Sequence, residues 1–402
     1  MKYIIILGDG MADEPIPELD NKTPLQAAST PTIDWLAYNG RLGMLHTVPN
    51  GYTPGSEIAN LALLGYNIPK VFEGRGSLEA ASMGVEIEPN QLAARCNLIC
   101  VEDGKIKNHS AGHISTEDGT ELINYLEEKL GNEIVKFHAG ISYRHLLKIN
   151  GGNKDVTCTP PHDVPGVACS EVMVTANSPE AQGTADLLNN LIIKSQELLK
   201  EHPINLKRIA KGKDPANSIW MWSPGYKPSM ETLSEQYGIE SGVVISAVDL
   251  IRGIGVYAGL TPIIVEGATG LYDTNYEGKA EAAIEALKDN DFVFLHVEAS
   301  DEAGHEGDYE LKKRTIEYLD SRICKPVLEA TLKMDEPVAI AVLPDHPTPC
   351  RIKTHTNSPV PFIIFRPGTR PDKIQQYDEF NARYGDYGVL REDEFIKEFL
   401  RK

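Results

Sequence analysis

The chain has 402 residues, of which 41% are hydrophobic and 24% are charged, and its formal net charge is −19. This charge argues against a nucleic-acid-binding surface, which needs clustered lysine and arginine, and against binding to an anionic membrane surface. The sequence has no apolar run long enough to span a bilayer, and its amino terminus enters a strand without a basic region or cleavage site. We therefore expect a soluble, cytoplasmic protein that binds a small molecule through metal ions or a few arginines.

At this length we expect one large α/β domain with a second, smaller domain. Residues 1–84 contain expected strands at 3–8 and 42–48 and a helix near 56–64. Residues 85–178 alternate strand-like pieces with the turns E-D-G and N-G-G, which indicates an inserted α+β substrate or cap domain with an antiparallel sheet. From residue 179 to 402 a helix near 181–201 precedes further alternating elements, which predicts a doubly wound parallel sheet. The strands expected in this last part lie near 217–222, 243–247, 262–266, 291–298, 338–343 and 360–365.

Six cysteines are present, and their spacing does not match a zinc site. Cys96 and Cys100 lie in a strand-like stretch rather than in a turn. We interpret the cysteines as reduced thiols that mostly contribute to packing.

Three apolar strands each end in an aspartate, and histidines follow the later two. The segments are Y-I-I-I-L-G-D at 3–9, D-F-V-F-L-H-V-E-A-S-D-E-A-G-H at 291–305 and V-A-I-A-V-L-P-D-H at 338–346. The carboxyl ends of parallel strands meet at one edge of a sheet, where open α/β sheets bind ligands. Carboxylates and imidazoles gathered there would repel one another and lose solvation without a cation, so we predict a pair of divalent metal ions. The candidate ligands from these segments are Asp9, Asp301, His305, Asp345 and His346.

Each of these segments also has an ordinary structural interpretation. An aspartate at a strand end often forms an Asx-turn or a helix N-cap, and a single Asp-His pair is usually a surface feature. Three such segments together, with His355 shortly after the third, favour the metal site.

A candidate nucleophile lies in the segment G-Y-T-P-G-S-E-I-A-N-L-A-L-L-G-Y at 51–66. Ser56 stands where a loop becomes a helix, and a serine there can simply cap the helix. Beside two metal ions, however, a serine hydroxyl at a helix amino terminus can become an attacking alkoxide, while the helix N–H groups favour phosphoryl oxygens. Ser56 would then carry a phosphoryl group between two half-reactions.

These motifs resemble those of the alkaline phosphatase superfamily and, more narrowly, of the cofactor-independent phosphoglycerate mutases of the archaeal type. The resemblance covers essentially the whole chain. It is carried by G-D-G-M-A-D at 8–13, G-S-E-I-A-N-L-A-L-L-G-Y at 55–66, G-R-G-S-L-E-A at 74–80, P-A-N at 215–217, D-E-A-G-H-E-G-D at 301–308 and P-D-H-P-T-P at 344–349.

The resemblance implies an alkaline-phosphatase-like core with a smaller domain that closes over the substrate. It also implies two divalent metal ions, usually manganese, with zinc or magnesium as alternatives. One ion would be held by Asp301, His305 and His355, and the other by Asp9, Ser56, Asp345 and His346.

One loop departs from the family pattern. Where the archaeal mutases tend to have Asp-Arg-Arg-Ala-Gly-Arg, residues 108–113 read N-H-S-A-G-H, and Trp222 stands where the pattern often has arginine. An imidazole offers one donor where a guanidinium offers a charged fork, so anion binding should weaken. The residues that we expect at the substrate are Asn108, His113, Arg144, His162 and Arg252.

The sequence leaves several functions open. The first is a mutase that interconverts 2- and 3-phosphoglycerate through phospho-Ser56. The altered loop favours a second, a phosphotransferase acting on a small hydroxy amino acid, because such variants resemble a bacterial subgroup proposed to be homoserine kinases. A metal-dependent phosphatase is the third, and a metal-binding protein without activity is the last, since it would not need a poised serine. Whole-chain similarity favours the mutase.

Overall fold

The computed structural model describes residues 1–401 and divides into two compact units. Unit 1 consists of Met1–Phe72 and Ser229–Lys402, and unit 2 consists of Glu73–Pro228. Unit 2 is longer at both ends than the expected inserted domain of residues 85–178, because flanking elements pack on its sheet. Within the described residues, no helix is long and apolar enough to cross a membrane.

Unit 1 is built on an eight-stranded sheet with the order β11-β10-β12-β1-β13-β14-β2-β15. The strands are β1 (Lys2–Gly8), β2 (Arg41–His46), β10 (Gly242–Ile245), β11 (Thr261–Ile263), β12 (Phe292–Val297), β13 (Val338–Leu343), β14 (Val360–Phe365) and β15 (Val389–Arg391). The pairs from β11 to β13 are parallel, whereas β14 is antiparallel to both β13 and β2. The expectation of a parallel sheet was therefore wrong for β14, since an apolar run does not record the direction of its strand.

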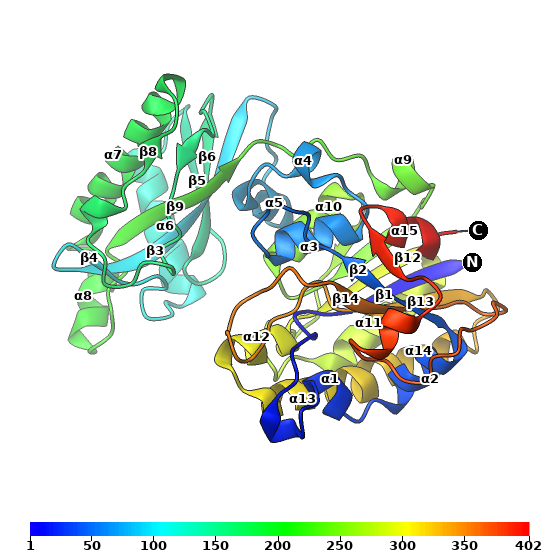
Figure 1. Cartoon of the computed structure of the whole chain (residues 1–402). Helices are drawn as coiled ribbons and strands as arrows, with labels where there is room; N and C mark the ends of the chain where they lie inside the picture. The colour runs from blue at the N-terminus through cyan, green and yellow to red at the C-terminus, as the bar shows by residue number, and fades with distance from the viewer. Residues whose placement is uncertain (402) are drawn as a thin grey trace. The chain divides into compact units, whose positions relative to one another are not determined.

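Helices lie on both sides of this sheet. Figure 1 shows α3 and α10 on one side and α2, α11 and α14 on the other, which is the predicted doubly wound arrangement. The α-helices of unit 1 are α1 (Pro24–Ala27), α2 (Pro31–Asn39), α3 (Ser56–Leu63), α4 (Ile68–Val71), α9 (Leu233–Tyr237), α10 (Asp249–Tyr257), α11 (Tyr276–Asp289), α12 (Ala299–Glu306), α13 (Tyr309–Tyr318), α14 (Lys325–Thr331) and α15 (Glu394–Phe399). Short 3-10 helices at Pro17–Leu19 and Asn381–Tyr384 and a π-helix at Leu319–Cys324 complete it.

Unit 2 contains an antiparallel sheet with the order β4-β3-β6-β5, in which β9 also pairs with β3. Its strands are β3 (Gln91–Glu102), β4 (Lys105–Asn108), β5 (Val135–His138), β6 (Arg144–Asn150), β7 (Val156–Thr157), β8 (Thr175–Ala176) and β9 (Ser218–Gly225). Its α-helices are α5 (Arg75–Ser82), α6 (Thr116–Leu130), α7 (Gln182–Leu199) and α8 (Pro203–Ala210), with 3-10 turns at Cys169–Glu171 and Pro179–Ala181. The expected strand near 217–222 is β9, so it was wrongly placed in the parallel sheet. Its apolar sequence fits a buried strand of either kind.

The three strands that end in aspartate are neighbours in unit 1. Strand β1 lies between β12 and β13, and their registers pair Gly8 with Val297 and Leu7 with Leu343. The residues that follow these three strands therefore emerge at the same edge of the sheet, as the sequence predicted.

Candidate metal centre and active site

The first group at this edge is formed by Asp301 and two imidazoles. Asp301 Oδ2 lies 3.2 Å from His305 Nε2, and Asp301 Oδ1 lies 3.4 Å from His355 Nε2. The two Nε2 atoms are only 2.9 Å apart. Asp301 and His305 lie on α12, one turn apart, whereas His355 comes from the segment between β13 and β14. Three ligand-type side chains thus converge from two separate segments of the chain.

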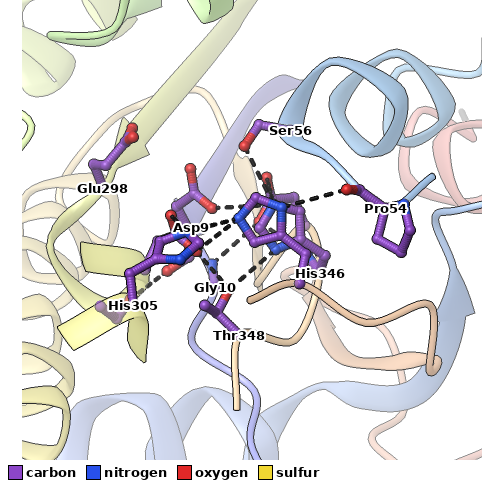
Figure 2. Close-up of polar contacts among 12 residues, drawn as sticks. Asp9, Gly10, Pro54, Ser56, Glu298, His305, His346 and Thr348 are labelled. Atoms are coloured by element: carbon purple, nitrogen blue, oxygen red, sulfur yellow. Dashed lines mark hydrogen bonds and ion pairs between the residues drawn. The ribbon is translucent and has the colours of Figure 1, made fainter. Parts of the chain in front are cut away.

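The second group surrounds His346, directly after β13. His346 Nε2 lies 3.5 Å from Asp345 Oδ2, 3.6 Å from Asp9 Oδ1 and 3.2 Å from Ser56 Oγ. Asp345 is held in place by hydrogen bonds from Gly10 N and Asn60 Nδ2. Figure 2 shows Asp9, Ser56, His305 and His346 pointing toward a common centre. The structure therefore brings together all seven predicted metal ligands, which are Asp9, Ser56, Asp301, His305, Asp345, His346 and His355.

The electrostatics of the two groups fit bound cations. Burial raises the pKa of Asp9 well above its usual value, and the charges of Asp345 and Asp301 add to the effect. Burial would also raise the pKa of Asp301, but hydrogen bonds with His305 and His355 outweigh it and hold that pKa well below its usual range. The same contact raises the pKa of His305 to about 9. Buried Asp9 Oδ1 has no hydrogen-bond partner within residues 1–401. Carboxylate and imidazole donors suit divalent manganese, zinc or magnesium, and cations would relieve the repulsion among the carboxylates.

A buried lysine joins the loops that carry these ligands. Lys312 on α13 is fully buried, and its Nζ lies 2.8 Å from Asp13 Oδ2, 2.8 Å from the Thr348 carbonyl oxygen and 3.1 Å from the Ala12 carbonyl oxygen. Thr348 in turn donates through Oγ1 to Asp301. The loop after β1, the loop after β13 and helix α12 are thereby connected. Sequence reasoning missed this lysine because its pattern is that of an ordinary amphipathic helix.

Ser56 is the first residue of α3, and its hydroxyl faces the second group rather than capping the helix. The N-cap is Gly55, and no side-chain cap is formed there. The simple capping interpretation therefore does not describe Ser56. The first N–H groups of a helix lack intrahelical acceptors and can bind phosphoryl oxygens. The hydroxyl thus lies next to both the cluster of carboxylates and imidazoles and the free N–H groups at the start of α3.

The altered loop at residues 108–113 belongs to unit 2, and its residues face different surroundings. Asn108 uses its side chain within the chain, since Nδ2 donates to Asp214 and Oδ1 accepts from Gly112 N at 2.9 Å. Ser110 is 3% exposed, whereas His113 is exposed and has a φ of 52°. Of the loop residues expected at the substrate, His113 is accessible and Asn108 shapes the turn.

His162 lies in a cluster of rings in unit 2. Its ring centroid is 5.2 Å from that of Trp222 and 5.9 Å from that of His109. Burial lowers the pKa of both imidazoles. The structure thus brings His162, which matches the archaeal pattern, together with His109 and Trp222, which depart from it.

Two arginines border the same indole ring, and sequence reasoning did not assign them a role. The guanidinium carbons of Arg75 and Arg95 lie 5.7 and 5.5 Å from the Trp222 ring centroid. Both arginines pair with Glu79, at 2.8 Å from Arg75 Nε and 2.5 Å from Arg95 Nη1. Burial would raise the pKa of Glu79, but the two guanidinium charges outweigh it and lower that pKa. A charged residue within the buried strand A-A-R-C was the available signal for Arg95.

Arg144 and Arg252 lie in different units. Arg144 begins β6, is exposed, and places its guanidinium 5.4 Å from the Tyr143 ring centroid. Arg252 lies on α10, the helix that packs against α3, and forms an ion pair with Asp249. Its buried Nε has no hydrogen-bond partner among residues 1–401.

The whole chain is similar to proteins of one enzyme family. The family model described as 2,3-bisphosphoglycerate-independent phosphoglycerate mutase matches residues 37–205. A protein of that name from Methanosarcina acetivorans is 50% identical over 398 residues, covering 98% of each chain. The chain belongs to the 2,3-bisphosphoglycerate-independent phosphoglycerate mutase family.

Other members and solved structures extend the likeness over the full chain. The second such mutase of Methanothermobacter thermautotrophicus is 48% identical and covers 97% of this chain and 94% of its own. A Pyrococcus horikoshii protein of known structure has a TM-score of 0.84 at 31% identity, covering 99% of this chain and 97% of its own. The cofactor-independent phosphoglycerate mutase of Thermoplasma acidophilum has a TM-score of 0.69 at 25% identity, with 100% and 99% covered. The protein is therefore an enzyme of the mutase family, and the matches to its relatives cover the residues of both units.

Proposed function

We propose that the protein interconverts 2- and 3-phosphoglycerate through a phosphoserine at Ser56. The observation that carries this proposal is the position of Ser56 Oγ at the start of α3, 3.2 Å from His346 Nε2 and beside the carboxylate and imidazole cluster. Membership of the mutase family supports the same reaction. The substrate is a small phosphorylated acid.

The residues present would hold two divalent ions, which we propose to be manganese. Asp301, His305 and His355 would hold one, and Asp9, Asp345, His346 and Ser56 the other. When bound, such ions favour deprotonation of the serine and neutralise charge on the phosphoryl oxygens. Zinc and magnesium are alternatives that the donor types also allow.

The chain's own groups supply the rest of the chemistry. Ser56 Oγ loses its proton and attacks phosphorus, the bond from phosphorus to the substrate's O3 breaks, and O3 takes up a proton to become a hydroxyl. The 2-hydroxyl of the retained glycerate then loses its proton and attacks the same phosphorus, the bond from phosphorus to Ser56 Oγ breaks, and Ser56 takes up a proton. The N–H groups in the first turn of α3 would donate to the phosphoryl oxygens in both steps.

We propose that unit 2, whose core includes the expected 85–178 segment, is a substrate-binding domain that recognises a small anionic group. Arg144, His162 and His113 are the accessible residues of that set, and the Arg75 and Arg95 pair adds positive charge near His162. Arg252 would act near Ser56 within unit 1, because its helix α10 packs on α3, the helix of Ser56. Asn108 would act indirectly, by holding the loop that presents His113.

The altered loop favours a second candidate, a phosphotransferase that acts on a small hydroxy amino acid. Imidazole replaces guanidinium there, and a neutral ring pairs less strongly with an anion. A phosphatase would differ from both candidates in that water hydrolyses the phosphoserine.

The test is an assay of purified, Mn²⁺-loaded protein with 3-phosphoglycerate, with homoserine and ATP, and for release of inorganic phosphate. We expect mutase turnover, a phosphorylated peptide containing Ser56 by mass spectrometry, and loss of both in Ser56→Ala. Ser115→Ala is the matched control, because Ser115 accepts a hydrogen bond from Asp118 N as the N-cap of α6 and lies in unit 2. Turnover retained by folded Ser56→Ala would contradict the covalent mechanism. Product formed only in the assay with homoserine and ATP would select the second candidate.

A further inference from the structure

Among residues 1–401, the sheet edge contains three overlapping groups of ligand-type side chains, and the residues of two of them belong to the proposed metal centre. The third group consists of Asp9, His296 and Glu298. It shares Asp9 with the proposed second metal position. Figure 2 shows Glu298 at the margin of the cluster, apart from His346 and His305. This group could either bind a third ion or hold Asp9 in place for the second ion.

The hydrogen bonds of His296 favour the second role. His296 lies in β12 and is fully buried, with Nε2 2.9 Å from Asp9 Oδ2 and Nδ1 3.1 Å from Ser246 Oγ. Val248 N donates to Ser246 Oγ at 3.0 Å, which leaves the serine O–H to donate to Nδ1. The ring proton then resides on Nε2 and is donated to Asp9 Oδ2. Both ring nitrogens are thereby used.

The two oxygens of the Asp9 carboxylate therefore have different contacts. Oδ2 is held by His296, whereas buried Oδ1 has no hydrogen-bond partner in the described chain and lies 3.6 Å from His346 Nε2. Asp9 Oδ1 is thus free to bind an ion at the proposed second metal position. Asp345, the other carboxylate there, is supported by comparable hydrogen bonds from Gly10 N and His346 N.

The surroundings of Glu298 also disfavour a third divalent ion. Lys279 on α11 is buried, and its Nζ lies 3.2 Å from the His296 carbonyl oxygen. Its charge interacts with that of Glu298. The buried Lys279 amine therefore lies beside the His296 backbone, and a divalent ion bound to His296 Nε2 would have to displace the proton donated to Asp9.

We infer that His296 is a positioning residue that fixes Asp9 with one oxygen directed at the second metal position, and that the Asp9, His296 and Glu298 group binds no third ion. The inference rests on the proposed metal centre. Hydrogen-bond partners of metal ligands restrict ligand orientation, and their loss typically lowers metal affinity about 10–100-fold.

The test is equilibrium dialysis of the metal-depleted full chain against Mn²⁺, with folding checked by circular dichroism. We expect two ions per wild-type chain. In His296→Leu the first ion should bind as in wild type, whereas the second should bind about 10–100-fold more weakly. His296→Gln should recover part of that affinity, because its amide can donate to Asp9, and it keeps the test valid if the leucine variant does not fold.

His145→Leu is the matched control, because His145 is a buried histidine of unit 2 that accepts from Gly140 N. It should leave both Mn²⁺ affinities unchanged. Three ions in wild type with two in His296→Leu would make His296 a ligand and overturn the inference. Unchanged second-ion affinity in folded His296→Leu and His296→Gln would overturn it as well. Wild-type protein that binds no Mn²⁺ would overturn the metal centre itself, which is a distinguishable result.

Discussion

The protein contains two polar clusters of opposite charge, one in each unit. In unit 1, three aspartates and three histidines converge after β1, β12 and β13, and the aspartates are almost fully buried. In unit 2, Arg75 and Arg95 share one carboxylate, Glu79, beside Trp222 and His162. The first cluster has more negative charge than its own side chains can balance, and the second has more positive charge.

This difference indicates which kind of ligand each cluster can accept. Buried carboxylates are stable only when paired with cations, so the unit 1 cluster needs ions that the chain does not supply. The unit 2 cluster balances part of its charge internally, because Glu79 pairs with both arginines. Divalent cations therefore suit the unit 1 cluster, whereas the unit 2 cluster retains a net positive charge.

The largest effect should come from removing a ligand of the unit 1 cluster. Asp301→Asn and His355→Ala should each lower turnover more than about 100-fold and remove about one metal ion, because both residues face the same position. The double variant should be no worse than either single one, since their effects are not independent. Elemental analysis and turnover measure both changes.

Asp308→Asn is the control for this pair of variants. Asp308 caps α13 by accepting from Leu311 N, and asparagine caps equally well. Two full equivalents of metal in either ligand variant would exclude that residue from the site.

The next effect should come from the unit 2 cluster, as a loss of stability. Arg95→Met would leave Glu79, whose side chain is 6% exposed, with Arg75 as its remaining cation. Removing one partner of a buried ion pair typically costs about 3–5 kcal/mol, and we expect the lower end because Arg75 stays. The change in free energy of unfolding can be measured by urea denaturation.

A double variant separates charge from packing in that experiment. Glu79→Gln with Arg95→Met should recover most of the loss, because no uncompensated charge is then buried. Arg144→Met is the control, since that arginine is exposed and should cost less than about 1 kcal/mol. Equal losses in the single and double variants would show that packing rather than charge decides the stability of the cluster.

Sequence predicted the first cluster far better than the second, for a physical reason. Parallel neighbouring strands deliver their end residues to one edge, so Asp9, Asp301 and Asp345 could be grouped without coordinates. His296 was missed because it lies inside the apolar run F-V-F-L-H-V, where its role depends on the neighbouring strand. In unit 2, Arg95 approaches Trp222 through antiparallel pairing of β3 with β9, and periodicity does not reveal that pairing.

In the altered loop at residues 108–113, too, the sequence alone did not predict which side chains are buried and which are exposed. Its sequence suggested that Asn108 and His113 both face the substrate. The structure buries Ser110, whose Oγ accepts from His113 N at 3.3 Å, so an arginine at 110 would disrupt the loop rather than restore an anion contact. His113 is therefore the position at which charge can be added without burying it.

The smallest effect should come from His113→Arg, and it tests whether the loop selects the substrate. A charge-assisted hydrogen bond contributes about 1.5–3 kcal/mol, but an exposed position reduces this, so kcat/KM for 3-phosphoglycerate should rise roughly 2–10-fold. Homoserine, which lacks a phosphate, should show little change, and His113→Gln provides the uncharged control of similar reach. An unchanged kcat/KM in folded His113→Arg would place this residue away from the substrate. A much larger gain from a very low starting rate would mean that the natural loop disfavours phosphoglycerate, which supports the phosphotransferase while leaving Ser56 and the metal centre in their proposed roles.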